Sequence, residues 1–371
     1  MKSLASSSIT RRKFLRGASV AGAAVAAGVH SKSLWAAALP QATQRVQPPM
    51  VDKGFASVQK VGEGIYAVIS DTSKGFDTLC NGGFVIGKDA VLLWEGFAKS
   101  TGAAFQIETM RSVSKLPIKC AIDSHYHFDH SFGNAQYAAN GIPIWAHEKV
   151  VPTIMERYAA YQNKSKAAIF APAENHLKDA VSERDKEHAE GDLNSLKVVF
   201  GLVDSTPITL PNVSLAVADL PMKVDLGGGM VVIIEAHPGH TSGDLILRIP
   251  SQDTVFSGDL LFNQSFPVTF DADMAAWLRA LNLFGSYGPN TLFVPGHGPV
   301  CGVEAVQMMV DVFGDLAQHA RQMVQLGVPL REAQARYDAP DRFKNLRMYA
   351  WGFCVDQAVA QFYKAASSGN V

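Results

Sequence analysis

The sequence is poor in charge and in long apolar runs. Charged residues make up only 18% of the 371 residues, against 47% hydrophobic residues. This is the opposite of the balance found in intrinsically disordered proteins, so a folded chain is expected. Beyond residue 38 no apolar run approaches the roughly 20 residues that a transmembrane helix needs. We therefore expect no stable membrane anchor.

Cysteine is also scarce. The four cysteines are Cys80, Cys120, Cys301 and Cys354, and no two of them form a CxxC pair. Each stands in an apolar or turn context, which is typical of a buried thiol that packs like a small apolar side chain. A zinc site made of cysteines is therefore disfavoured, and the spacings define no disulfide pairing.

Acidic residues are missing from residues 1–38, which hold six lysines and arginines. The rest of the chain has the other 27 basic residues against all 34 acidic ones, a net charge of −7. Because an acidic surface repels phosphate groups, nucleic acid and anionic membranes are not expected partners. A small-molecule substrate fits this composition better.

Residues 1–38 have the order of an export signal. Residues 10–16 read Thr-Arg-Arg-Lys-Phe-Leu-Arg, a soft Ala/Gly/Val stretch follows at 17–29, and three alanines at 36–38 offer a cleavage site. This order is typical of a secretory signal. The arginine pair before Phe-Leu resembles a twin-arginine signal, which predicts export to the periplasm by that machinery. The alternative, an amphipathic anchor, has too little apolar area to hold well.

The remaining chain divides into three segments. Residues 39–54 are rich in proline and glutamine and predict a linker. In residues 55–300, short apolar strands alternate with segments of helical spacing, which predicts an α/β layer architecture. Within them, the charged stretch at about 148–200 predicts a helical insertion. Residues 301–371 predict a helical extension that packs on the same domain.

The strongest chemical signal follows the buried strand predicted at 118–122. Residues 124–130 read Ser-His-Tyr-His-Phe-Asp-His, so His125, His127, Asp129 and His130 stand within six residues. Packing gives no reason to gather such groups, and without a metal their desolvation would be uncompensated. The motif therefore predicts a metal site.

Three later positions repeat this logic. His240 lies in Pro-Gly-His-Thr-Ser-Gly-Asp, Asp259 in Ser-Gly-Asp-Leu-Leu-Phe, and His297 in Pro-Gly-His-Gly. Each is predicted to follow the end of a strand at once, with a glycine that lets the backbone turn closely. We expect these three side chains to complete the metal site.

In this order the motifs HxHxDH, GHTxGD, SGDxLF and PGHG resemble the metallo-β-lactamase superfamily of hydrolases, with a glyoxalase II-like motif set. The resemblance covers roughly residues 60–300 and implies a four-layered αββα sandwich with metals at one edge. It also implies one metal held by His125, His127 and His240, a second held by Asp129, His130 and His297, and Asp259 bridging both.

Two features depart from the family's usual pattern, and a third distinguishes between its branches. Glu95 stands where an aspartate is usual, so the support of the ligands there is expected to differ. The spacing from His130 to His240 is long, which the insertion at 148–200 explains; this insertion is expected to cap the site as a lid. Asp259 stands where one antibiotic-degrading branch has a cysteine, which argues against that branch.

The ligand set predicts hydrolytic chemistry. Imidazoles and carboxylates without a thiolate suit two zinc ions and tolerate iron or manganese. Two such ions would share a hydroxide, which is predicted to attack an ester, lactone, thioester or lactam carbonyl. Asp129 is predicted to be catalytic as well, by orienting this hydroxide and moving its proton. His237 is predicted to have a structural role or to support the ligands, rather than to bind metal.

Substrate and reaction class leave alternatives open. Five aromatic residues could line the pocket: Phe262, Phe266, Phe270, Trp277 and Tyr349. Among them, Trp277 fits a core position better. An apolar ester or lactone is the favoured substrate. A rival interpretation is an enzyme with one iron that oxygenates persulfides. Another is a non-catalytic metal-binding protein of the periplasm.

Overall fold

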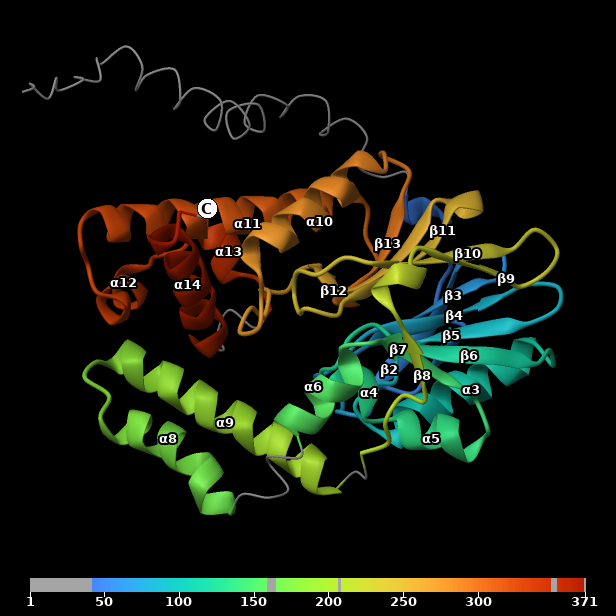
Figure 1. The fold of residues 1–371 in the computed structure, drawn as a ribbon, viewed down its shortest axis with the longest axis horizontal. Helices are drawn as coiled ribbons and strands as arrows, with labels where there is room; N and C mark the ends of the chain where they lie inside the picture. The colour runs from blue at the N-terminus through green and yellow to red at the C-terminus, as the bar shows by residue number, and fades with distance from the viewer. Residues whose placement is uncertain (1–41, 159–164, 206–207, 348–351, 370–371) are drawn as a thin grey trace, which may run out of the picture.

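The computed structural model describes residues 42–158, 165–205, 208–347 and 352–369. Two β-sheets lie face to face, with helices on both outer faces (Figure 1). The predicted four-layered αββα sandwich is therefore confirmed. The export signal predicted for residues 1–38 lies outside the described residues. Among those that are described, no helix is both long and apolar enough to cross a membrane.

The first sheet has eight strands in the order β1 to β8. They are β1 (Val51–Asp52), β2 (Ala56–Gly62), β3 (Ile65–Ser70), β4 (Gly82–Ile86), β5 (Val91–Trp94), β6 (Ile118–Asp123), β7 (Ile144–His147) and β8 (Val213–Leu215). Neighbouring strands are antiparallel from β1 to β5 and parallel from β5 to β8. The parallel part needs crossover connections, which contain α3 (Ser100–Val113), α4 (Phe128–Ser131) and α5 (Asn134–Ala139).

The second sheet has five strands in the order β13-β12-β11-β10-β9. They are β9 (Met222–Asp225), β10 (Val231–Ala236), β11 (Leu245–Ile249), β12 (Thr254–Phe262) and β13 (Leu292–His297). Only the pair β12 and β13 is parallel, and α10 (Met274–Ser286) makes the crossover between them. Short 3-10 turns lie at Thr43–Arg45, Val217–Asp219 and Pro250–Gln252.

The strands have two apolar faces. Along β5, Leu92 and Trp94 belong to the cluster between the sheets, whereas Val91 and Leu93 belong to the cluster that includes residues of α3. This alternation is the period of two expected for a strand buried on both sides. The first sheet is therefore covered by the second sheet on one face and by helices on the other.

The C-terminal helices cover the second sheet. They are α11 (Val303–Gln325), α12 (Leu330–Arg336), α13 (Asp341–Lys344) and α14 (Gly352–Ser367). Phe313 of α11 and Phe362 of α14 share one buried cluster with Trp277 of α10 and with Leu260 and Phe293 of the sheet. Residues of this extension and of the sheet therefore form one continuous core.

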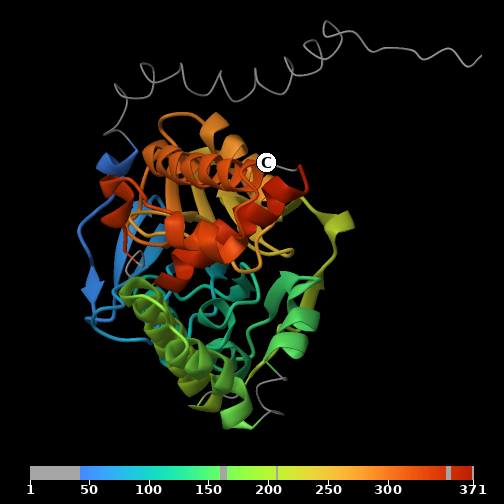
Figure 2. The same ribbon diagram turned by 90° about the vertical axis from the view of Figure 1, so that its left-hand side faces the viewer.

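The insertion lies between β7 and β8. It contains α6 (Val150–Arg157), α8 (Lys166–Lys178) and α9 (Glu183–Ser205). Helices α8 and α9 lie side by side, and α9 also lies next to α14 (Figures 1 and 2). His188 of α9 is hydrogen-bonded to Asp356 of α14. Asp185 of α9 pairs with Arg331 of α12 at 3.2 Å.

Two segments differ from the sequence-based expectation. The stretch 39–54, predicted to be a linker, includes β1, which pairs with β2 in register. In the same stretch the guanidinium of Arg45 donates hydrogen bonds to the carbonyls of Gln252 and Asp253. The apolar run Leu215-Ala216-Val217 favours a strand, but β8 ends at Leu215, which pairs with His147, the last residue of its partner β7.

All four cysteines are buried, as expected. Burial raises the pKa of the thiols of Cys80, Cys301 and Cys354, and that of Cys120 to about 12. These thiols therefore stay protonated at neutral pH. The expectation that they pack as small apolar groups agrees with this environment.

Trp277 gives a test of this core. It is fully buried, and its indole N–H donates to the carbonyl of Leu260 at 2.9 Å. The centroid of its ring lies 5.1 Å from that of Phe313. We predict that Trp277→Ala lowers the free energy of unfolding by about 3–5 kcal/mol. Trp277→Phe keeps much of the volume and should cost about 1–3 kcal/mol, mainly for the unpaired carbonyl. Urea unfolding followed by circular dichroism measures both; equal, small losses would contradict the core role.

Candidate metal centre

The carboxyl end of β6 opens the site. The chain leaves this strand and turns within a few residues into the four-residue helix α4, with His127 at the N-cap position. This tight turn keeps His125, His127, Asp129 and His130 close together, and the three imidazoles are buried. A strand end followed by a short helix thus supplies four of the seven predicted ligands.

The second sheet supplies the other three. His240 lies in the loop between β10 and β11, and His297 is the last residue of β13. Asp259 does not follow a strand end as predicted, because it lies inside β12, which continues to Phe262. It comes directly after Gly258, whose φ is +51° and where the pairing with β13 shifts register. Such a bulge re-aims the side chain that follows it.

The seven side chains form two groups. In each group, the nitrogen and oxygen atoms that could bind a cation lie within 4.8 Å of one another. The first group consists of His125, His127, His240 and Asp259, and the second of Asp129, His130 and His297. In the first group, Nδ1 of His127 lies 2.9 Å from Nε2 of His125 and 3.0 Å from Nε2 of His240. In the second, Oδ2 of Asp129 lies 3.4 Å from Nε2 of His297.

Asp259 borders both groups. Its Oδ2 lies 3.4 Å from Nε2 of His240, and 3.3 Å from Nε2 of His297. Its Oδ1 lies 3.2 Å from Nε2 of His130. A carboxylate that faces both groups with two oxygens has the geometry of a bridging ligand.

The imidazoles of the first group are held neutral. Burial lowers the pKa of His125 and His127 well below the usual value, and that of His240 to about 4. A neutral imidazole keeps the lone pair that a metal ion requires. The environment of these three rings therefore suits cation binding.

The second group, together with Asp259 which borders it, has the opposite charge pattern. Burial alone would lower the pKa of His297, but Asp259 and Asp129 raise it to about 9. Burial alone would raise the pKa of Asp259, but His297 and His130 hold it well below its usual value. The rings and carboxylates compensate each other's charge, so protons compete with a cation for the same atoms.

Two atoms at the centre test whether a metal fits. Nε2 of His130 and Oδ1 of Asp259 are buried, and although they lie 3.2 Å apart neither atom makes a hydrogen bond. Buried polar atoms without a partner are costly. A cation held between them would satisfy both atoms, so the donor set fits a metal centre.

Several polar groups orient these rings from outside. Oε2 of Glu95 lies 3.2 Å from Nδ1 of His130 and accepts the backbone N–H of Ser124. The hydroxyl of Ser124 lies 2.9 Å from Nδ1 of His125, and the carbonyl of Val268 lies 3.0 Å from Nδ1 of His240. Glu95 is fully buried, so it supports a ligand directly despite its departure from the family's aspartate.

Other predicted residues lie elsewhere or only at the margin. His237 pairs with Glu235 at 3.0 Å and belongs to neither group. Among the aromatic residues, Phe262, Phe266 and Trp277 are buried in the core cluster. From within this core, the ring of Phe262 lies 5.1 Å from that of His297 and the ring of Trp277 lies 5.2 Å from that of His240. Phe270 is 40% exposed, with its ring 4.9 Å from that of His127. Tyr349 lies outside the described residues.

Sequence reasoning missed one polar neighbour of the site. The carboxylate of Asp271 lies 3.6 Å from Nε2 of His127. It stands in the loop between β12 and α10, in a stretch without a strand end or a glycine that could have marked it. Only the folded chain brings it to the ligand.

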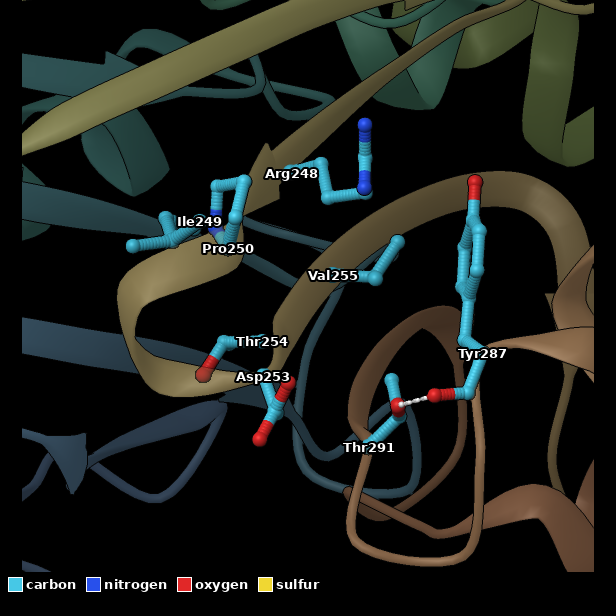
Figure 3. Close-up of a pocket in the computed structure, with 8 residues that line it drawn as sticks. All are labelled: Arg248, Ile249, Pro250, Asp253, Thr254, Val255, Tyr287 and Thr291. Atoms are coloured by element: carbon cyan, nitrogen blue, oxygen red, sulfur yellow. Dashed lines mark hydrogen bonds between the residues drawn. The ribbon is translucent and has the colours of Figure 1, made fainter.

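A pocket elsewhere has no part in this centre. It measures about 90 Å³ and lies where β11, β12 and the end of α10 meet, beside Arg248 and Tyr287 (Figure 3). Arg248 is already paired with Glu235 at 2.7 Å. The pocket is smaller than the roughly 300 Å³ of usual ligand sites, and none of the seven side chains lines it.

Solved structures that are similar to this chain include a metallo-beta-lactamase from Pontibacter korlensis, with 15% identity, a TM-score of 0.46, and coverage of 72% of this chain and 97% of that one. FIM-1 from Pseudomonas aeruginosa, in its mono-zinc form, has 21% identity, a TM-score of 0.45, and coverage of 70% and 94%. A hydroxyacylglutathione hydrolase from Bartonella henselae is 27% identical over 146 residues, which are 35% of this chain and 57% of that relative.

The sequence pattern of the metallo-beta-lactamase superfamily matches residues 76–297. This is more than half of the chain, and it contains all seven side chains of the two groups. It also contains the strands β6, β12 and β13 that position them. The chain therefore belongs to the metallo-beta-lactamase superfamily.

Proposed function

We propose that the protein is a hydrolase that binds two zinc ions through its seven clustered side chains and cleaves an ester, lactone, thioester or lactam. One observation carries this proposal: candidate ligands from four separate segments form two groups that meet at Asp259. Membership of the metallo-beta-lactamase superfamily supports the same class of reaction.

The chemistry of the ligands favours zinc. Five imidazoles and two carboxylates are borderline to hard donors, which suit zinc and also accept iron or manganese. The buried thiol of Cys80 belongs to neither group, and its Sγ donates to the backbone carbonyl of Asp129 at 2.9 Å. Burial raises the pKa of this thiol, so it remains a protonated group that is a poor metal ligand.

Bound divalent cations would lower the pKa of water enough to supply a hydroxide nucleophile at neutral pH, and would polarise the substrate carbonyl. Asp129 would orient this nucleophile and accept its proton. Burial alone would raise the pKa of Asp129, but His130 and His297 lower it. The carboxylate is therefore ionised and available as an acceptor.

The aromatic ring of Phe270 could contact an apolar group next to the carbonyl of the substrate. Phe270 keeps 40% of its surface exposed although its ring lies 4.9 Å from that of His127. The carbonyl of Phe270 accepts a hydrogen bond from Gln361 of α14 at 2.7 Å, which holds the loop in place. We therefore favour esters and lactones with apolar groups.

The proposal makes a prediction about metal content and turnover. The purified protein should contain two zinc ions per chain by elemental analysis. It should hydrolyse at least one member of a panel of apolar esters, lactones, lactams and thioesters. Hydroxyacylglutathione joins this panel because of the similar Bartonella henselae hydrolase. A chelator should abolish turnover, and added zinc should restore it.

Two outcomes of the same measurement would contradict the proposal. One iron per chain, with oxygen consumed on a persulfide, would identify the oxygenating enzyme. Two metal ions without turnover on any member of the panel would identify a non-catalytic metal-binding protein.

A substitution of the ligand candidate His127 tests the proposed metal site. We expect His127→Ala to remove one cation per chain and to reduce turnover to about 1% or less. His237→Ala is the matched control, because this histidine pairs with Glu235 outside both groups. Elemental analysis and initial rates measure both variants. A His127→Ala variant that keeps two cations and full turnover would refute the assignment.

We further propose that the protein reaches the periplasm by the twin-arginine route. The support is the arginine pair at positions 11 and 12, the soft apolar stretch after it and the alanines at 36–38. This route carries proteins already folded, which suits a protein that acquires its metal ions in the cytoplasm.

The double substitution Arg11→Lys and Arg12→Lys tests the route. We expect it to retain the protein, with its full N-terminus, in the cytoplasm of a Gram-negative host, whereas the unchanged protein appears shortened in the periplasm. Cell fractionation with mass spectrometry of the N-terminus measures both. Equal export of both proteins would contradict twin-arginine transport.

A further inference from the structure

Asp271 lies at a junction of three elements. Its Oδ2 accepts a hydrogen bond from the hydroxyl of Tyr126 and lies 3.6 Å from Nε2 of His127. Its Oδ1 accepts a hydrogen bond from the guanidinium of Arg157, the last residue of α6. The side chain of Asp271 is only 13% exposed. This carboxylate thus connects the ligand turn, the loop after β12 and the insertion.

The two nitrogens of His127 have different surroundings. Nδ1 faces the first group, 2.9 Å from Nε2 of His125 and 3.0 Å from Nε2 of His240. Nε2 faces the opposite way, is buried and has no hydrogen-bond partner within 3.5 Å. A neutral imidazole that binds a cation through Nδ1 must carry its proton on Nε2. That proton needs an acceptor, and Asp271 is the carboxylate beside it.

We propose that Asp271 is a positioning residue, which accepts the Nε2 proton of His127 and so directs Nδ1 toward the cation, and that Arg157 holds Asp271 in this position. The inference rests on the proposed metal site and adds to it. A partner of this kind fixes the tautomer and the ring orientation of a metal-binding histidine.

The insertion therefore contributes to the metal centre. Arg157 belongs to α6, which lies in the segment between β7 and β8. The next residue, Tyr158, accepts the backbone N–H of Phe128 at 3.0 Å and packs its ring 4.9 Å from that of Phe132. The end of α6 thus touches the ligand turn both through Asp271 and directly. The insertion thus supports a ligand through Arg157 and Asp271, in addition to the expected role of a lid.

The alternative is that the ion pair between Arg157 and Asp271 only connects the loop between β12 and α10 to α6. Such a link would affect the stability of the fold, but the affinity of the folded protein for a cation would stay the same. Metal affinity therefore separates the two roles. Because His127 belongs to one group only, the effect should also be confined to one of two bound cations.

The test is a graded series of variants titrated with zinc against a chromophoric chelator. We expect Asp271→Ala to weaken binding of one zinc ion about 10–100-fold, whereas the second ion binds as in the unchanged protein. Asp271→Asn should weaken it less, because its carbonyl is a weaker, uncharged acceptor. Arg157→Gln should act in the same direction with a smaller effect. Cobalt absorption spectra should change for one site only.

Asp311→Ala is the matched control. Asp311 forms a similar ion pair with Arg342 at 3.0 Å, and neither residue is among the seven ligand candidates. This variant should lose some thermal stability without any change in zinc affinity. If Asp271→Ala behaved in the same way, the inference would be overturned and the pair would be a fastening only. If the unchanged protein bound no zinc at all, the proposed function itself would fail.

Discussion

The carboxylate of Asp259 lies within 3.4 Å of imidazoles from three segments of the chain. Such crowding leaves no room for side chains on the neighbouring backbone. A Cβ atom at Gly296 would lie only 1.9 Å from Oδ1 of Asp259, so only glycine fits there. Gly258 provides the positive φ of the bulge that aims the carboxylate inward. The two glycines thus serve the close approach of polar groups.

The sandwich brings these segments together because the two sheets are joined at the edge that carries the site. The backbone N–H of Leu245 donates to the carbonyl of Ser124 at 2.8 Å, which connects the turn after β6 to β11. The N–H of Asn81 donates to the carbonyl of Gly296 at 2.7 Å, and its side-chain amide donates to Pro295 at 2.9 Å. The sheets also pack through apolar side chains, and at this edge the directional hydrogen bonds help to fix their relative position.

The sequence reveals those parts of the site that depend on local pattern. His125 and His127 are recognisable because metal-binding side chains crowd after an apolar strand. Asp259 is recognisable by its motif, but its position within β12 is not, because the bulge depends on pairing with β13. Asp271 carries no local signal, since its partners come from α4's turn and from α6. The alternation of apolar residues predicts the layers, but the pairing of β1 with β2 in a proline-rich stretch arises from tertiary contacts.

The contact between α9 and α14 has a consequence for the order in which the molecule is completed. His188, in the insertion, is hydrogen-bonded to Asp356, which lies within the final helix. A ribosome delivers His188 168 residues before Asp356. The surface of α9 that packs against α14 therefore stays exposed until α14 has been synthesised. A nascent chain that stops before α14 would leave this surface exposed, open to proteases and to association with other chains.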